Sequence, residues 1–244
     1  MEKRLFVIKN RTHYLIARNY IKNKPAAENF IFLTIRKFKG YKEFSEELSR
    51  DTEFKLLEVM ITDHSFPGWN YVMVIKNILK VKNIASKFEY FDEVIFANYH
   101  TWMQHFIIQQ FKSKRKVLLS DGTRVLTVAE LRKKDKSINL KSVPFGGGKF
   151  IIKDLLNIEP IENLHFYSPV KIDVAEGDTL ETFHFKPSES STVDRNKILF
   201  IGSPLVEIEY ITLERQLYYL KKIKEHFKGS EIYYFSHRRE EKKT

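Results

Sequence analysis

Asp121 and Gly122 come just after a short apolar run, Lys116–Leu119, from which Ser120 separates them, and an aspartate in this position is suited to acid–base chemistry. An aspartate can accept a proton from a substrate hydroxyl when burial or a neighbouring charge adjusts its pKa. Gly122 permits a turn in which the backbone approaches a ligand closely. The alternative is an ordinary Asp-Gly turn, in which the aspartate bonds to its own backbone, and the spacing alone favours that alternative.

A second polar group follows another apolar run, Glu231–Phe235. It consists of Ser236, His237, Arg238, Arg239 and Glu240. A histidine at this place can donate a proton or a hydrogen bond to a leaving phosphate near neutral pH. Arginines supply bidentate donors to the same phosphate. The alternative is a solvated run of charges, which needs no function.

Strand-like and helix-like segments alternate over the first 120 residues and would position the first group. Between the apolar runs, residues such as Tyr14, Ala17 and Ile21 recur at helical spacing. The runs that we predict to be strands are Leu5–Ile8, Phe30–Ile35, Leu56–Thr62, Glu93–Ala97 and Lys116–Leu119. This alternation predicts an α/β fold with a parallel sheet, in which ligands bind beyond the carboxyl ends of the strands. Asp121 would lie at that edge.

A second α/β pattern begins after a polar connector, Glu189–Thr192. A strand at Ile198–Ile201 leads into Gly202 and Ser203, and an amphipathic helix precedes the strand at Glu231–Phe235. One strand, one helix and one strand bury too little surface to be stable alone. We therefore predict an N-terminal domain at 1–188, a linker at 189–196, and at 197–244 the incomplete beginning of a C-terminal domain.

The composition narrows the classes of function. The chain of 244 residues has no cysteine, which excludes disulfides and a cysteine nucleophile. Lys and Arg total 42 against 31 Asp and Glu, and the net charge of +11 would attract polyanions, unless it is only a solvated basic surface. The histidines show no metal-ligand spacing, so we expect no metal site. With no signal peptide or membrane span, the expected location is the cytoplasm.

Short motifs in both halves of the chain resemble glycosyltransferase family 52, the bacterial lipooligosaccharide sialyltransferases, and more distantly the bacterial polysialyltransferases. Leu119-Ser120-Asp121-Gly122-Thr123 resembles the acidic-acidic-Gly motif, and Tyr234–Glu240 resembles the histidine motif. Phe200–Glu207 resembles the entry into the second domain, and Leu164–Ser168 resembles an aromatic stretch before the linker. The motifs occur in the same order as in the family. Ser120 departs from the pattern, because the family has a second acidic residue there.

This resemblance implies a GT-B fold, with two Rossmann-like domains, the second of them truncated here. It implies a metal-independent sialyltransferase that uses CMP-sialic acid as its donor, needs no cofactor and acts on a terminal galactose of a lipooligosaccharide or capsular glycan. Asp121 would be the general base and His237 would stabilise or protonate the departing CMP. The donor nucleotide would be held by Gly202, Ser203, Ser236, Arg238 and Glu240.

Two alternatives stay open. A GT-B enzyme could use another nucleotide sugar with the same residues. A basic nucleic-acid-binding protein is disfavoured, because the aromatic residues follow the periodicity of a core and are not interleaved with Lys and Arg. The expected partners are thus a nucleotide sugar, a glycan acceptor and an anionic surface at the inner face of the cytoplasmic membrane. A homodimer is compatible with the sequence, and the incomplete second domain leaves open whether the chain is active.

Overall fold

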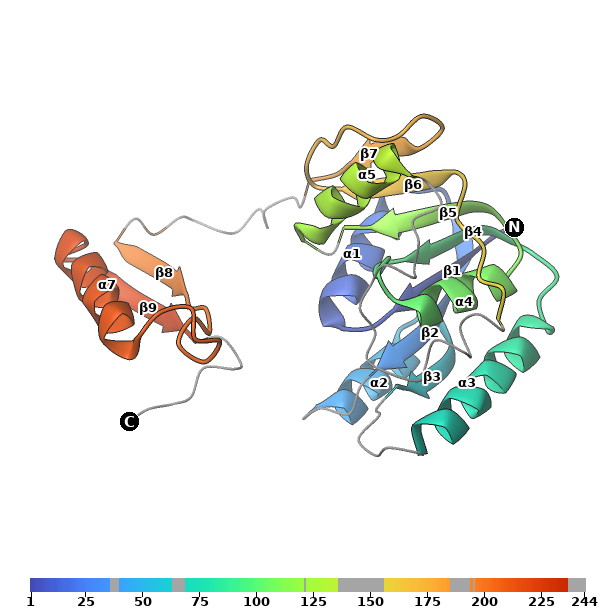
Figure 1. Ribbon diagram of the computed structural model, residues 1–244, viewed down its shortest axis with the longest axis horizontal. Helices are drawn as coiled ribbons and strands as arrows, with labels where there is room; N and C mark the ends of the chain where they lie inside the picture. Colours follow the sequence, from blue (N-terminus) through green and yellow to red (C-terminus); the bar gives the residue numbers. More distant parts are fainter. Residues whose placement is uncertain are drawn as a thin grey trace. The chain divides into compact units, whose positions relative to one another are not determined.

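A computed structural model describes residues 1–35, 40–62, 69–120, 122–135, 156–184, 194 and 196–236, with only the backbone of residues 69–71 (Figure 1). The chain divides into two compact units, Met1–Phe185 and Lys186–Thr244. No helix in the described ranges is long and apolar enough to cross a membrane.

The first unit is an α/β domain of Rossmann-like type, built on a seven-stranded sheet in which every neighbouring pair of strands is parallel. The strand order is β3-β2-β1-β4-β5-β6-β7. Its strands are β1 Glu2–Ile8, β2 Ala27–Ile35, β3 Lys55–Ile61, β4 Phe91–Phe96, β5 Ser113–Leu119, β6 Leu164–Ser168 and β7 Thr179–Thr182. All five strands predicted in the first 120 residues are confirmed. The strands β6 and β7 were not predicted from the sequence.

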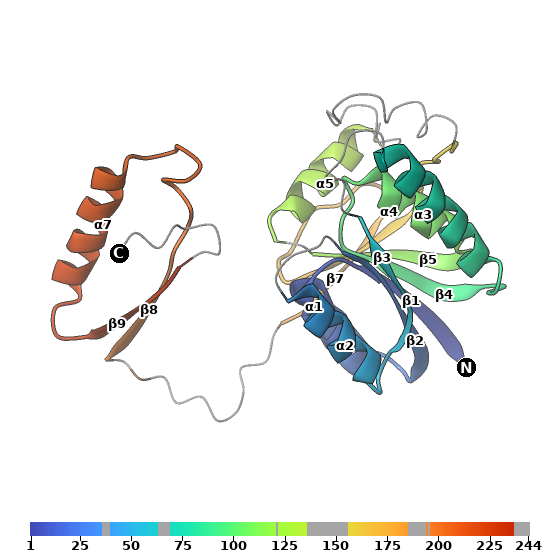
Figure 2. The ribbon, with the colours of Figure 1, turned by 90° about the horizontal axis from the view of Figure 1, so that it is seen from below.

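Helices cover both faces of this sheet. Figure 2 shows α1 and α2 on one face and α3, α4 and α5 on the other. Their bounds are α1 Arg11–Lys22, α2 Tyr41–Arg50, α3 Trp69–Ala85, α4 Trp102–Gln110 and α5 Arg124–Lys134. Sheets covered in this way have strands that are apolar on both sides, which is why the strands appear as continuous apolar runs in the sequence.

The strand β1 shows how the core is divided between the two faces. Its residues Leu5, Phe6, Val7 and Ile8 are all fully buried. Leu5 and Val7 belong to the core cluster that contains residues of α3, α4 and α5, whereas Phe6 and Ile8 belong to the cluster that contains residues of α1 and α2. Side chains alternate across a strand, so a single apolar run supplies both halves of the core.

The helix α5 is anchored by a buried arginine. Arg132 stands seven residues after Val125 on the buried face of the helix. Its Nε donates to Asp178 Oδ2 at 2.6 Å and its Nη2 to Oδ1 at 2.6 Å, and both side chains are inaccessible to solvent. The remaining guanidinium N–H groups donate to the Tyr99 hydroxyl and to the carbonyls of Ile161 and Glu162. All five donors of the guanidinium therefore have acceptors.

The second unit contains two parallel strands and one helix. These are β8 Lys197–Ile201, α7 Leu213–His226 and β9 Glu231–Phe235, as the sequence pattern predicts within a residue or two. The Thr212 hydroxyl caps α7 by accepting a hydrogen bond from the backbone N–H of Arg215. No residue of α7 is fully buried. The GT-B arrangement of two domains stays a prediction.

Candidate functional site

The order in which strands are added to the sheet of the first unit reverses between β1 and β4. The chain proceeds from β1 through β2 to β3 on one side and then returns to add β4 to β7 on the other. The two connections that leave β1 and β4 at their carboxyl ends therefore diverge, and the crevice between them is where ligands bind in sheets of this kind. The residues that follow β1, β4 and β5 form the candidate site.

A chain of hydrogen bonds crosses this switch point. The Lys9 ammonium, just after β1, donates to the Thr101 hydroxyl at 3.2 Å, and that hydroxyl donates to Asn98 Oδ1 at 2.9 Å. The backbone N–H of Asn98 donates to Gln104 Oε1 at 2.8 Å, and the buried Gln104 amide reaches the carbonyl of Val7 at 3.3 Å. Residues 92 positions apart are joined by the first of these bonds. The network fixes the loop after β4 against the end of β1.

A small cavity lies beside the network, between the ends of β4 and β5 and the helix α5. It has a volume of about 10 Å³, close to the space of one water molecule, and its lining includes Asn98, His100 and Arg124. Burial and the nearby Arg124 guanidinium hold the pKa of His100 below its ordinary value. A neutral imidazole at this place can both donate and accept hydrogen bonds.

The turn after β5 is the part of the predicted site that the structure positions most clearly. The strand β5 ends at Leu119, as predicted, and the backbone N–H of the buried Ser120 donates to the carbonyl of Tyr167 in β6 at 2.9 Å. Gly122 has a φ of +71°, in the left-handed region that favours glycine. Asp121, between them, lies outside the described residues.

Two helices begin at this edge without a cap from their own N-cap side chain. Thr101 precedes α4 and Thr123 precedes α5, and neither hydroxyl accepts a capping hydrogen bond. The Thr101 hydroxyl bonds instead to Lys9 and Asn98. Unsatisfied backbone N–H groups at helix N-termini attract anions, as do Lys9 and Arg124. The edge therefore has the chemistry to hold a negatively charged ligand.

The described part of the second predicted group lies at the corresponding edge of the small sheet. Ile201 and Phe235 are partners in the parallel register, so Gly202, Ser203 and Ser236 follow neighbouring strand ends. The backbone N–H of the buried Gly202 donates to the carbonyl of Phe235 at 2.8 Å, whereas the serines are exposed. His237, Arg238 and Glu240 lie outside the described residues. The structure thus brings Gly202, Ser203 and Ser236 to one edge.

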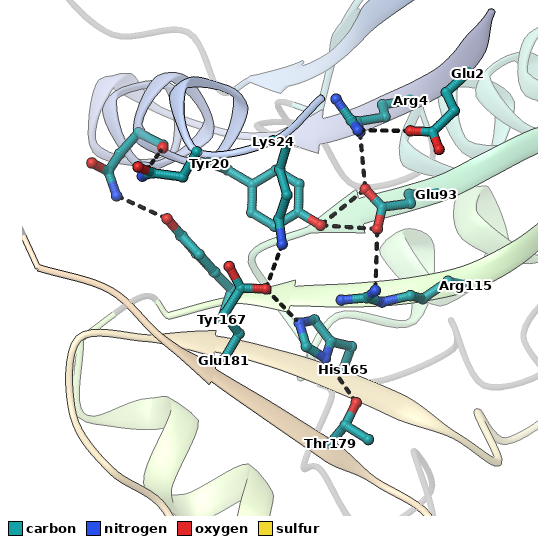
Figure 3. Close-up of polar contacts among 12 residues, drawn as sticks. Glu2, Arg4, Tyr20, Lys24, Glu93, Arg115, His165, Tyr167, Thr179 and Glu181 are labelled. Atoms are coloured by element: carbon teal, nitrogen blue, oxygen red, sulfur yellow. Dashed lines mark hydrogen bonds and ion pairs between the residues drawn. The ribbon is translucent and has the colours of Figure 1, made fainter. Parts of the chain in front are cut away.

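A second polar network lies at the opposite end of the large sheet and is structural. Figure 3 shows Glu93 receiving hydrogen bonds from Arg4 and Tyr20, with Arg115 at 3.6 Å. Burial, and after it the nearby Glu93 carboxylate, raise the pKa of Tyr20 above its ordinary value. These residues stand in the amino-terminal halves of their strands or at the end of α1. Parallel sheets bind ligands at the other end, so we assign this network to stability.

The same network continues through His165. Its Nδ1 lies 2.7 Å from the Thr179 hydroxyl and its Nε2 lies 3.4 Å from Glu181, which also binds Lys24 (Figure 3). Burial and Arg115 hold the pKa of His165 below its ordinary value. The stretch Leu164–Ser168, which resembled an aromatic segment before a linker, is strand β6 in the middle of this network.

Comparison with known proteins adds no family. No protein-family model matches the chain, and no curated protein is significantly similar to it. Across the described ranges, no three His, Asp or Glu side chains come together as a metal site would require.

Five residues of the candidate site were not predicted from the sequence: Lys9, Asn98, His100, Thr101 and Arg124. A usable signal existed for most of them, because polar residues that directly follow predicted strands are candidates in any parallel α/β sheet. Whether these residues lie close together depends on the strand order, however, because that order places β4 beside β1.

Proposed function

We propose that the chain is a glycosyltransferase of the sialyltransferase type, which transfers sialic acid from CMP-sialic acid to a glycan hydroxyl. The supporting observation is the position of the turn after β5. Ser120 and Gly122 lie at the carboxyl edge of a Rossmann-like sheet, where an intervening aspartate can meet a substrate. The choice of CMP-sialic acid as the donor rests on the resemblance of the motifs to glycosyltransferase family 52.

The proposed reaction uses Asp121 as the general base. The acceptor hydroxyl attacks the anomeric carbon of sialic acid while its proton passes to the Asp121 carboxylate. The bond between that carbon and the CMP phosphate oxygen breaks, and His237 donates to the phosphate as its charge develops. No metal is required, since protein donors neutralise a monophosphate leaving group. Gly202, Ser203, Ser236, Arg238 and Glu240 hold the nucleotide in this proposal, which includes the GT-B arrangement.

The positive groups of the candidate site also favour an anionic substrate. Lys9 and Arg124 lie at the same edge as the turn, and Arg124 borders the cavity with His100. A carboxylate of sialic acid or a phosphate on a lipid-linked acceptor would match them. We place the reaction in the cytoplasm, at the inner face of the membrane where such acceptors are made.

Ligand-dependent stability tests the donor. Thermal unfolding is measured alone and with millimolar CMP, UDP, GDP or a short oligonucleotide. Of these ligands, only CMP is expected to raise the melting temperature, because a ligand that binds only the folded state stabilises it by mass action. A shift with UDP or GDP instead would support another nucleotide sugar. A shift with the oligonucleotide alone, falling steeply with salt, would support nucleic-acid binding.

A transfer assay with variants tests the base. Asp121→Asn is expected to reduce sialyl transfer by at least a hundredfold, as removal of a general base does. Asp173→Asn is the matched control, because Asp173 is 87% exposed and pairs only with Lys133 among the described residues. Equal activity of the two variants would exclude Asp121 as the base.

A further inference from the structure

The helix α3 presents apolar side chains to solvent as well as to the core. Val74, Ile78 and Val81 are buried against the sheet. On the outer side, Val72 is 57% exposed, Ile75 50% and Leu79 62%. These three residues are spaced three and four apart, so they form one stripe along the outside of the helix.

Lysines flank this stripe on both sides. At 3.6 residues per turn, Lys76 falls on one flank of the stripe and Lys82 on the other. The helix Trp69–Ala85 contains no acidic residue. Lys80 pairs with Glu58 of β3 at 2.8 Å, whereas Lys76 and Lys82 make no ion pair with any described residue. The outer side of α3 therefore combines an apolar centre with uncompensated positive charge.

The position of α3 leaves this side accessible within the first unit. Figures 1 and 2 show α3 at the end of the layer that also contains α4 and α5, with α4 as its neighbour. A helix of 17 residues is about 25 Å long, and its stripe runs parallel to its axis. The helix can thus lie flat on a surface.

We propose that the outer side of α3 binds the surface of an anionic phospholipid membrane. Val72, Ile75 and Leu79 would enter the boundary between headgroups and acyl chains, while Lys76 and Lys82 contact the phosphates. Charge complementarity decides for a membrane over a second copy of this chain, which carries a net charge of +11 and would repel itself. This inference does not rest on the identity of the sugar donor.

Vesicle sedimentation tests the proposal. The full chain is mixed with vesicles of neutral phosphatidylcholine, or of phosphatidylcholine with 30% phosphatidylglycerol (about a third anionic, enough for a negative surface potential). We expect binding to the anionic vesicles only, weakening as salt rises. Neutralising one lysine near the surface is expected to weaken binding about fivefold.

Double variants of α3, compared with a matched double variant of α1, separate a loss of membrane binding from a loss of folding. Ile75→Glu with Lys76→Gln, and separately Leu79→Glu with Lys82→Gln, are expected to lose binding by more than tenfold. The matched control is Leu15→Glu with Lys22→Gln on α1, where both residues are exposed on the opposite side of the sheet (Figure 2). Circular dichroism selects variants whose melting temperature is unchanged.

Three outcomes would overturn the proposal. They are equal binding by the α3 variants and the α1 control, equal binding of the wild-type chain to neutral and anionic vesicles, and no binding at all. Light scattering in the absence of lipid tests the alternative, in which the stripe binds a second copy of this chain. A dimer that the α3 variants dissociate and the α1 control preserves would assign the stripe to self-association.

Discussion

Arg132 of α5 and Asp178, just before β7, form a bidentate ion pair in which neither side chain is accessible to solvent. Asp178 Oδ1 also accepts a hydrogen bond from the backbone N–H of Leu164 at 2.9 Å, at the start of β6. One carboxylate therefore holds together a helix and two strands. The same guanidinium reaches the hydroxyl of Tyr99, which lies in the loop after β4 and lines the candidate site.

Breaking this pair is expected to destabilise the first unit strongly. Arg132→Met leaves the Asp178 carboxylate buried without its partner, and Asp178→Asn does the same to the guanidinium. Each is expected to lower the free energy of unfolding by about 3–5 kcal/mol. Urea denaturation measures the loss. Lys133→Met is the control, since Lys133 forms surface pairs and should cost less than about 1 kcal/mol. Similar losses for both would contradict the buried role.

His105 is expected to make the fold sensitive to acid. Its Nε2 lies 2.6 Å from the carbonyl of Tyr99 and therefore carries the proton, while its Nδ1 has no partner among the described residues. Burial lowers the pKa of His105 to about 4. The unfolded chain thus binds a proton that the folded chain does not, so stability decreases as pH falls from about 6.5 toward 4, by about 3 kcal/mol in total.

The variant His105→Gln separates this effect from other titrating groups. A glutamine amide can still donate to the Tyr99 carbonyl but does not titrate. Urea unfolding at pH 7.5, 6.5, 5.5 and 4.5 is expected to show a shallower decrease for the variant than for the wild-type chain. Parallel decreases would mean that His105 does not contribute, and His100 and His165, whose pKa values are also lowered, would then be examined.

Gly122 is expected to be required for its backbone conformation and not for space. A Cβ built on it would meet no atom within 4 Å, but its φ of +71° is strained for other residues. Gly122→Ala should therefore cost about 1 kcal/mol, and Gly122→Asn less, because asparagine tolerates the left-handed region. Thermal denaturation compares the two. Equal costs would show that the turn does not keep this conformation.

Arg124 is expected to affect the titration of His100 directly. Burial is the main cause of the lowered pKa of His100, and the positive charge of Arg124 adds to it. Arg124→Gln should raise that pKa, which an NMR titration of the imidazole measures. Arg11→Gln is the control, since Arg11 pairs with Glu47 of α2. An unchanged pKa in the Arg124 variant would place the guanidinium away from the imidazole in solution.

Part of the candidate site could be predicted from local sequence. The apolar run that became β5 ends at Leu119, so the position of the turn at Ser120 and Gly122 followed from the end of a strand. The helix α7 and its flanking strands were predicted in the same way, from apolar spacing alone. Such patterns are local because the periods of helices and strands are properties of consecutive residues.

The sequence by itself determined the α/β class, the order of most elements and the edge at which polar residues would gather. Only the tertiary structure decided that β1 lies beside β4, which lets Lys9 reach Thr101. It also decided that Arg132 is buried while Lys133 beside it is not. Both outcomes depend on residues far apart in the chain, whose contacts are set by packing of the whole sheet and leave no periodic trace in the sequence.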